Sequence, residues 1–274
     1  QDVARRHLCL HDLVRFGGWQ TVFSGLSGLT ASADRFVIGW LSGAAATALY
    51  AIPYSVASRL QVLPQAVMRT LYPKLSAAED DETRRALAAR ALTATLALMA
   101  VVTVPAILIV RPFFAVWIDA DFARSAGPVA QILLMAIYVQ ASLRTLFVFQ
   151  RASGRPDIPA KLRTASALPF MAALVLLVWP FGAIGAALAL TLRFAGEMLW
   201  MLRVSHLLDR TLATLGAFLG LCAASMALSS TGYGLPLAIV VACAAILVLT
   251  FFALRLSPDL RRVFEALPHR SLAK

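Results

Sequence analysis

Eight stretches of this chain are each about as long and as apolar as a helix that crosses a lipid bilayer, and this pattern constrains the fold most strongly. A spanning helix needs about 20 mostly apolar residues. Turn-like sequences such as SGRPDIP and STGYGLP separate the stretches. The predicted spans are 17–41, 45–68, 88–110, 127–150, 164–180, 183–203, 211–230 and 235–254. The sequence therefore predicts an all-α integral membrane protein with about eight transmembrane helices.

The composition agrees with a membrane protein. Apolar residues make up 60% of the 274 residues, charged residues make up 14%, and the mean hydropathy is +0.77. A soluble domain of this length would need a polar shell that the chain lacks. The chain begins with Gln1, and its opening residues lack the apolar core of a signal peptide, so we expect a piece of a longer protein that starts in a basic loop.

The polar residue types indicate no metal site, no cofactor and no disulfide framework. Three cysteines are an odd number, and none of them forms a Cys-x-x-Cys pair. The four histidines lie near the ends of predicted spans and form no His-x-x-x-His pattern. We therefore expect a function that depends on neither a metal ion nor a prosthetic group.

Basic residues are distributed very unevenly among the predicted loops. With the N-terminus in the cytoplasm, 19 of the 25 lysines and arginines fall on the cytoplasmic side, two fall outside, and four lie within spans, where Arg90 and Arg203 at span ends are counted with the cytoplasmic side. The positive-inside rule then places both termini in the cytoplasm. The net charge of +11 is spread over membrane loops, so we expect no nucleic-acid partner.

A polar stripe follows the second predicted span. Its members recur at steps of three or four residues, which places them on one side of a helix. They are Tyr54, Ser58, Gln61, Gln65 and Arg69, with Arg59 at the edge. Two prolines, Pro53 and Pro64, remove backbone donors and should bend this helix.

The fourth predicted span carries a similar stripe with an arginine beside it. The stripe contains Gln131, Tyr138, Ser142 and Thr145, and Arg144 lies on the same half of the helix. Polar residues in membrane bundles often only bond helix to helix. Several polar-striped helices together favour a polar cavity, and we expect these stripes to line it.

Four arginines and two acids lie within the predicted spans. Arg193 and Glu197 are one turn apart and can pair. Asp34 and Arg35 are adjacent, so their side chains point about 100° apart and each needs a partner elsewhere. For Asp34 we expect Arg59 as that partner, and the alternative is a proton or Na⁺ that Asp34 exchanges during transport. The excess of arginine predicts a cavity with a cationic bias.

The run EDDETRRALAAR precedes the third span and is predicted to be a cytoplasmic helix. Ser76 and Glu79 have the spacing of a capping box for its first turn. The acids that follow lie at the positive end of the helix dipole, where they are stabilising. We expect a structural role for this run.

The first two spans carry a set of motifs in a familiar order. These are Gly17-Gly18-Trp19, Asp34-Arg35-Phe36, Tyr50 with Pro53-Tyr54, Arg59-Leu60, Leu63-Pro64 and residues 71–76. In this set the chain resembles the start of the second lobe of bacterial oligosaccharide flippases, whose superfamily also contains multidrug exporters and the lipid II flippase. The resemblance covers residues 13–254 and is densest over 16–76.

The resemblance implies the C-terminal lobe of a two-lobe flippase that acts by alternating access in the bacterial inner membrane. Such proteins move undecaprenyl-diphosphate-linked oligosaccharides to the outer leaflet for polysaccharide and lipopolysaccharide biosynthesis. Residues 1–203 would form a cavity-lining lobe of six helices, and 204–274 a peripheral helix pair with a cytoplasmic tail. The implied partners are the lipid-linked oligosaccharide, the bilayer, an N-terminal lobe, a polysaccharide polymerase and glycosyltransferases.

Chemistry assigns candidate roles to the polar residues of the spans. Arginine matches phosphate oxygens with a planar fork of donors, and hydroxyls and amides suit a sugar. The candidate substrate-binding residues are Arg35, Arg59, Arg144, Tyr54, Ser58, Gln61 and Gln65. The candidates for ion coupling or charge pairing are Asp34, Arg193 and Glu197.

Three other functions stay open on the sequence. A lipid II flippase or a cation-coupled drug exporter would have the same architecture, although a drug exporter should show an excess of intramembrane acids. A membrane glycosyltransferase or polymerase finds support only in Asp119-x-Asp121, which has the spacing of a metal-diphosphate motif. That pair lies in a predicted outer turn beside Trp117, so we expect no enzyme activity.

Overall fold

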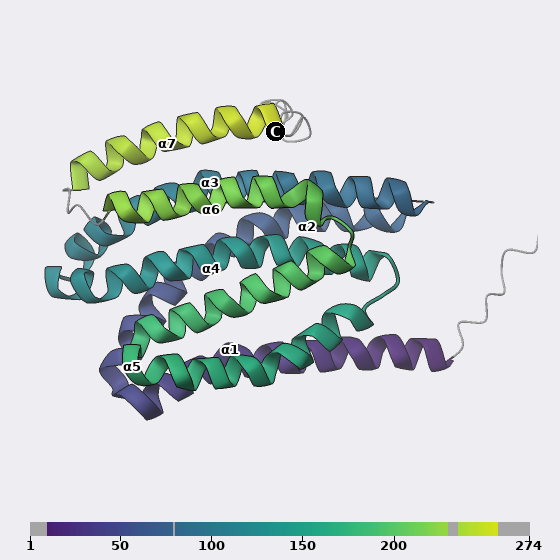
Figure 1. Ribbon diagram of the computed structural model, residues 1–274, viewed down its shortest axis with the longest axis horizontal. Coiled ribbons are helices and arrows are strands. Elements are labelled where there is room, and N and C mark those ends of the chain that lie inside the picture. Colours follow the sequence, from purple (N-terminus) through teal and green to yellow (C-terminus); the bar gives the residue numbers. More distant parts are fainter. Residues whose placement is uncertain (1–9, 79, 230–234, 257–274) are drawn as a thin grey trace, which may run out of the picture.

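A computed structural model of the chain describes residues 10–78, 80–229 and 235–256, and all regular structure in these ranges is helical (Figure 1). This result confirms the all-α prediction. The elements are α1 (Leu10–Ser58), the 3₁₀ helix η1 (Arg59–Gln61), α2 (Val62–Ser76), α3 (Asp81–Trp117), α4 (Ala120–Ala152), α5 (Asp157–Val204), α6 (Leu208–Ser229) and α7 (Leu235–Leu256).

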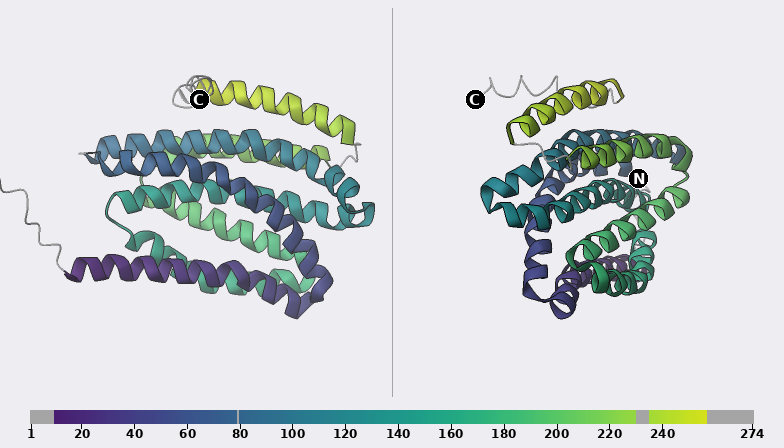
Figure 2. Two further views of the ribbon diagram at one scale, coloured as in Figure 1. Left: turned by 180° about the vertical axis from the view of Figure 1, so that it is seen from behind. Right: turned by 60° about the vertical axis from the view of Figure 1, so that its left-hand side comes forward.

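Two of the longest helices change direction sharply at a glycine (Figures 1 and 2). Gly43 in α1 has φ 81°, and Gly182 in α5 has φ 53°. Residues with a side chain rarely adopt these positive φ values, whereas glycine does so at little cost. Both breaks coincide with joints between predicted spans, at 41–45 and at 180–183. The turn residues thus set where each long helix folds back.

The connection from α1 to α2 bends as its prolines predict. Pro64 has no N–H to donate to the carbonyl of Leu60, one turn earlier. The chain passes through the 3₁₀ helix at exactly this place, between Ser58 and Val62. The second half of α1 rises across one end of the bundle before α2 turns along it (Figure 2).

The two ends of the bundle differ in their connections (Figure 1). The breaks at Gly43 and Gly182 and the α3–α4 connection lie at one end. The α2–α3, α4–α5 and α5–α6 connections lie at the other end, and these contain the arginine-rich segments that the topology prediction places in the cytoplasm. Successive connections therefore alternate between the two ends of the bundle, as the topology prediction requires.

Exposed tryptophans lie near both ends of the bundle. Trp40 and Trp179 are each 80% exposed and lie three residues before a glycine break, and Trp117 ends α3 at the same end. Trp200 is half-exposed near the opposite end of α5. The 18 residues from the Gly182 break to Trp200 span about 27 Å, which is close to the hydrocarbon thickness of a bilayer. Tryptophan is enriched at membrane interfaces, so this spacing fits a bilayer-embedded bundle.

Four helices in the described part of the chain are long and apolar enough to cross a membrane. They are Ala33–Gln65, Asp81–Trp117, Ala120–Ala152 and Asp157–Val204. This finding is compatible with a multi-pass membrane protein. The number of eight spans stays a prediction.

Helices α3 and α4 form the centre of the bundle. Phe114, Tyr138 and Phe147 are among the largest fully buried side chains, and all three belong to these helices. Helices α6 and α7 each pack against α3, with α7 at the edge (Figure 1). The assignment of residues 204–274 to a peripheral helix pair with a cytoplasmic tail stays a prediction.

The polar stripe predicted on the fourth span does not line a cavity. Gln131 donates to the carbonyl oxygen of Ile107 at 3.2 Å and to the hydroxyl of Ser229. Thr145 donates to the hydroxyl of Thr95 at 3.2 Å. The expectation for this stripe was wrong because the stripe faces α3 and α6, where polar groups without water need partners from neighbouring helices.

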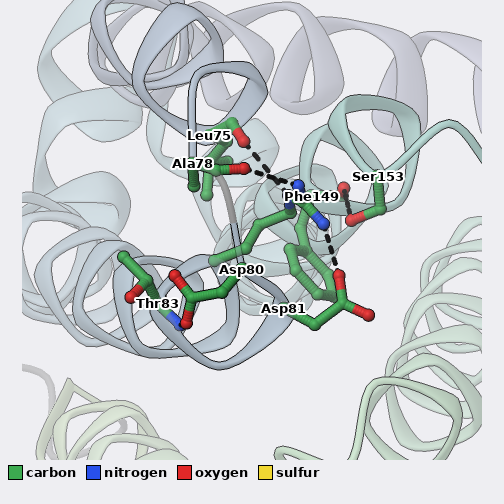
Figure 3. A network of polar contacts seen from close by, with 8 residues as sticks. Leu75, Ala78, Asp80, Asp81, Thr83, Phe149 and Ser153 are labelled. Atoms are coloured by element: carbon green, nitrogen blue, oxygen red, sulfur yellow. Dashed lines mark hydrogen bonds and ion pairs between the residues drawn. The ribbon is translucent and has the colours of Figure 1, made fainter.

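The corner between α2 and α3 is held by Arg84 and capped by Asp80 (Figure 3). Arg84 donates to the carbonyl oxygens of Leu75 and Ala78, at 3.2 and 2.7 Å. The Asp80 carboxylate accepts from the backbone N–H of Thr83 at 2.9 Å, and this bond lowers the pKa of Asp80 below its ordinary value. The predicted cap at Ser76 was therefore wrong, because Ser76 ends α2 and Asp80 is the N-cap of α3; Glu79 lies outside the described residues.

Candidate functional site

A cavity of about 480 Å³ lies between α1, α2, α4 and α5, and arginine dominates its wall. It extends toward the end of the bundle where α4 ends and α5 begins. Its lining residues are Asp34, Tyr54, Pro64, Gln65, Met68, Arg69, Gln140, Arg144, Phe147, Val148, Arg151, Arg163, Leu190, Arg193 and Phe194. Five of these are arginines and one is a carboxylate, so the wall attracts anions.

Two of the five arginines are held by one buried carboxylate. Glu197 is 2% exposed and accepts from Nε of Arg193 at 2.9 Å, and Nε of Arg163 lies 3.6 Å from its other oxygen. Ser166 donates a third contact to the same group at 2.6 Å. The predicted Arg193–Glu197 pair is confirmed, and it also joins the two legs of α5, because Arg163 and Ser166 precede Gly182.

The aromatic contacts of these arginines fix their planes. The guanidinium of Arg193 lies 4.6 Å from the ring centre of Phe170, and that of Arg163 lies 5.4 Å from the ring centre of Phe147. The Nη2 of Arg193 is buried without a hydrogen-bond partner among the described residues. Leaving a charged donor unsatisfied is costly, so this atom needs a partner that the described residues do not supply.

Arg144 reaches the cavity from α4. In the part of the chain that the structure describes, no carboxylate lies within ion-pair distance of it. Arg69 and Arg151 line the cavity nearer the end where α2 and α4 terminate. Arg144 and Arg193 thus occupy deep positions, and Arg69 and Arg151 lie toward the basic loops.

Asp34 and Tyr54 bring a polar and an aromatic side chain from α1 to the cavity wall, whereas the predicted site residue Arg35 is exposed and is not a lining residue. Asp34 is 2% exposed and accepts from the hydroxyl of Tyr50 at 2.6 Å and from the backbone N–H of Arg35 at 2.8 Å. The rings of Tyr50 and Tyr54 stack with centres 5.8 Å apart, and the guanidinium of Arg35 lies 5.5 Å from the centre of Tyr54. The expected Asp34–Arg59 pair was wrong because Tyr50, two turns before the bend, reaches Asp34 first.

The amides of the second stripe lie at the same wall. Gln65 lines the cavity, and Gln61 is buried and donates to the side-chain oxygen of Gln140, which also lines it. The stripe predicted on the second span is therefore placed at the cavity by Tyr54, Gln65 and Arg69. Its remaining member, Ser58, donates to the carbonyl oxygen of Ser55 on its own helix, at 3.1 Å.

Arg59 lies away from the arginine-lined cavity. It belongs to a separate hollow with Ser55 and Trp117, near the end of the bundle where α3 ends. Arg59 comes five residues after Tyr54, about 140° around the helix, and it shares a side with Ile52 and Ser55, which line the same hollow. The predicted role of Arg59 beside Arg35 in one substrate site is not supported by this placement.

Three cavity arginines were missed as site residues. Arg69 was placed in the polar stripe, and Arg151 and Arg163 were assigned to a basic loop. Arg163 is 8% exposed because the first turns of α5 fold back over the end of α4. No helical periodicity could reveal this, since the turn at Ser153–Pro156 separates the two helices.

The described residues contain no group of three His, Cys, Asp or Glu side chains that could hold a metal ion. The cavity chemistry therefore comes from guanidinium, amide and phenol groups. Such groups can bind and orient an anion with attached hydroxyls.

Comparison with known proteins gives two matches. The sequence model of a family described as "Polysaccharide biosynthesis protein" matches residues 4–119. A protein of Shigella flexneri named "Putative O-antigen transporter" is 27% identical over 194 residues, which cover 68% of this chain and 46% of the relative. Both matches support a polysaccharide-flippase type of family. The resemblance that the motifs of the first two spans indicated is thereby confirmed.

The chain spans about half the length of this curated relative. The family match ends at Asp119, so it includes α1 to α3 and excludes the cavity arginines of α4 and α5. No solved structure matches the chain.

Proposed function

We propose that this chain is one lobe of a flippase that moves undecaprenyl-diphosphate-linked oligosaccharide from the inner to the outer leaflet of a bacterial inner membrane. The observation that carries the proposal is the cavity wall with five arginines against one carboxylate. Cytoplasmic termini and an N-terminal lobe facing this one are parts of the same proposal.

A diphosphate needs cationic partners to leave water, because burying an unpaired charge is costly. Arg144 and Arg193 offer guanidinium groups at depth in the bundle, and such groups match phosphate oxygens with two parallel hydrogen bonds. The lining therefore suits the headgroup of a polyprenyl-diphosphate lipid.

The sugars need neutral donors and acceptors beside the cations. Tyr54, Gln65 and Gln140 supply a phenol and two amides on the cavity wall. The prenyl chain needs no site in the cavity, since it stays in the hydrocarbon. The polar cavity can therefore accept the headgroup while the prenyl tail remains in the bilayer.

The direction of the cavity supports alternating access. Arg69, Arg151 and Arg163 lie toward the end that carries the basic loops, which the topology prediction places in the cytoplasm. At the other end, the second half of α1 crosses the bundle (Figure 2). The described conformation therefore suits loading from the inner leaflet, and the outward state would require α1 and α2 to move.

A cation-coupled drug exporter is disfavoured by the same wall, because a cationic drug would meet five arginines. A lipid II flippase would bind the same diphosphate group, so only the sugar of the transported lipid distinguishes this alternative from the proposed function.

The test uses cells that lack their own O-antigen flippase and express the complete protein with variants of this lobe. Arg144→Ala should lower surface polysaccharide about tenfold or more at an unchanged protein level, because it removes a charged hydrogen-bond donor. Arg193→Ala should lower surface polysaccharide per inserted molecule by a similar factor, and it should also lower the protein level because buried Glu197 then loses one of its partners. Arg124→Ala is the matched control, since Arg124 is exposed at the other end and paired with Asp121. Wild-type display by the Arg144→Ala, Arg193→Ala double variant would overturn the proposal, and rescue of cells that lack lipid II transport would favour the alternative.

A further inference from the structure

A second charged hollow lies outside the arginine-lined cavity, at the opposite end of the bundle. It has a volume of about 470 Å³ and is lined by Ala51, Ile52, Ser55, Val56, Arg59 and Trp117. Arg59 is exposed, and no carboxylate of the described residues lies within ion-pair distance of it. The hollow therefore presents one positive charge with no acid to neutralise it.

The two acids nearest in sequence to Trp117 are engaged elsewhere. Asp119 caps α4 by accepting from the backbone N–H of Phe122 at 2.7 Å. Asp121 pairs with Arg124. Neither acid lines the hollow, so neither one supplies the counter-charge for Arg59.

An apolar groove of about 190 Å³ adjoins this hollow. It lies between the end of α1, α3 and α4, and its wall includes Ala57, Leu60, Ala106, Phe113 and Leu134. Val56 lines both the hollow and the groove. The ring of Phe113 in the groove stacks on the ring of Trp117 in the hollow, with centres 5.4 Å apart. The two spaces form one continuous surface with a charged part and an apolar part.

We infer that this surface binds a bilayer phospholipid that carries a net negative charge, with the phosphate at Arg59 and an acyl chain in the groove. Arginine is a good donor to phosphate oxygens. Trp117 and Arg59 lie near the end of α3, where exposed tryptophans mark the membrane interface at which phospholipid phosphates reside.

The number of arginines in each site distinguishes the bound phospholipid from the proposed transport substrate. The hollow contains one arginine, which suits the single charge of a phosphodiester. The arginine-lined cavity contains five, which suits a diphosphate. The occupant of the hollow is therefore a phospholipid of the leaflet on the Trp117 side, and the site is distinct from the transport path.

The experiment uses phosphatidylglycerol as the probe and phosphatidylcholine as its neutral counterpart. The complete membrane protein is purified, stripped of lipid and offered an equal mixture of the two, and retained lipid is counted by native mass spectrometry. The wild type should retain phosphatidylglycerol in preference. Arg59→Ala should lower this retention roughly tenfold, the size expected for loss of a charge-assisted contact. Arg59→Lys should keep part of it, because lysine keeps the charge without the fork.

Two further variants separate the two parts of the surface. Ala106→Leu narrows the groove from a half-buried position and should lower the retention of both lipids. Arg124→Ala, on an exposed and acid-paired arginine at the same end, should leave retention unchanged. Equal losses in Arg59→Ala and Arg124→Ala, or no loss in Arg59→Ala, would overturn the inference.

Two further results must be considered: Arg59→Ala does not fold, or the surface binds a lipid other than phosphatidylglycerol. If Arg59→Ala is not recovered folded, the wild type decides: phosphatidylglycerol must raise its melting temperature more than phosphatidylcholine, and an equal rise overturns the inference. A polyprenyl-diphosphate lipid can also be added as a competitor. If it displaces phosphatidylglycerol from the wild type but not from Arg59→Lys, the inference is overturned. Polysaccharide transport is not the readout, so the outcome does not depend on the proposed function.

Discussion

The Nε of Arg193 donates a hydrogen bond of 2.9 Å to Oε1 of Glu197, one turn further along α5. Both side chains are almost fully buried, and the same carboxylate faces Arg163 from the first leg of α5. One acid therefore holds two cavity arginines, from the two legs of α5, through their Nε atoms.

We predict that Glu197→Ala destabilises the protein by about 3–5 kcal/mol, because it leaves two buried arginines without their shared partner. Ser166→Ala removes only a neutral donor to the same carboxylate and should cost about 1 kcal/mol. Thermal unfolding of the purified variants in detergent measures the difference. Equal melting temperatures for the two variants would contradict the central role given to Glu197.

Gly185 should tolerate no side chain. A Cβ there would clash with the carbonyl oxygen of Leu177 on the other leg of α5, and backbone cannot give way as a flexible side chain does. Gly185→Ala should force the legs apart and cost at least about 1–3 kcal/mol, the usual size for overpacking. Gly196→Ala, where a Cβ meets nothing within 4 Å, is the control in the same helix. Normal membrane levels of Gly185→Ala would show that the two legs of α5 are further apart than in the structure described above.

Tyr50→Phe should destabilise the protein by about 1–3 kcal/mol, because Asp34 then loses its 2.6 Å hydroxyl donor while staying buried. Tyr72→Phe removes a hydroxyl from a half-exposed ring and is the control. A double-mutant cycle should show coupling between Tyr50→Phe and Asp34→Asn, and additive effects for Asp34→Asn with Arg59→Gln. Coupling of the second pair in place of the first would restore the Asp34–Arg59 pairing. Whether Asp34 also exchanges a proton or Na⁺ stays a prediction, tested by the ion response of Asp34→Asn.

The start of α3 should become less stable in acid. The bond from the Thr83 N–H holds the pKa of Asp80 below its ordinary value of 3.8. The stabilisation is therefore fully present above the pKa of the unfolded chain and is lost as the pH falls through the lower pKa of the folded state. Hydrogen exchange at residues 81–84, corrected for the intrinsic rate, should accelerate over this interval. Asp80→Asn keeps an acceptor without the titrating group, so an equal acceleration in that variant would assign the effect to another residue.

Cysteine labelling tests the predicted topology. With the native cysteines replaced, Ser125→Cys near the start of α4 should react with an impermeant reagent added to intact cells. Arg155→Cys, in the turn between α4 and α5, should react only after the membrane is opened. Both positions are exposed on the protein, so access from solvent decides the result. Labelling of Arg155→Cys in intact cells would show that the chain has the opposite orientation in the membrane.

The sequence determined the features that depend on neighbours along the chain. Apolar runs predicted the helices, Gly43 and Gly182 coincide with predicted joints, and Pro64 predicted the bend at η1. Arg193 and Glu197 could be paired because four residues are one helical turn. Tyr54 and Gln65 were placed at the cavity by helical periodicity alone.

Only the tertiary structure decided which polar residues share a cavity. A stripe on a helix does not reveal which neighbour it faces, so Gln131 and Thr145 bond to adjacent helices while Arg144 on the same helix reaches the cavity. Arg163 joins the cavity because the chain folds back after α4. Arg59 lies outside the cavity because the side of the helix that it shares with Ile52 and Ser55 faces the separate hollow near Trp117. Periodicity determines the side of a helix, whereas the packing of helices from distant parts of the chain determines what that side meets.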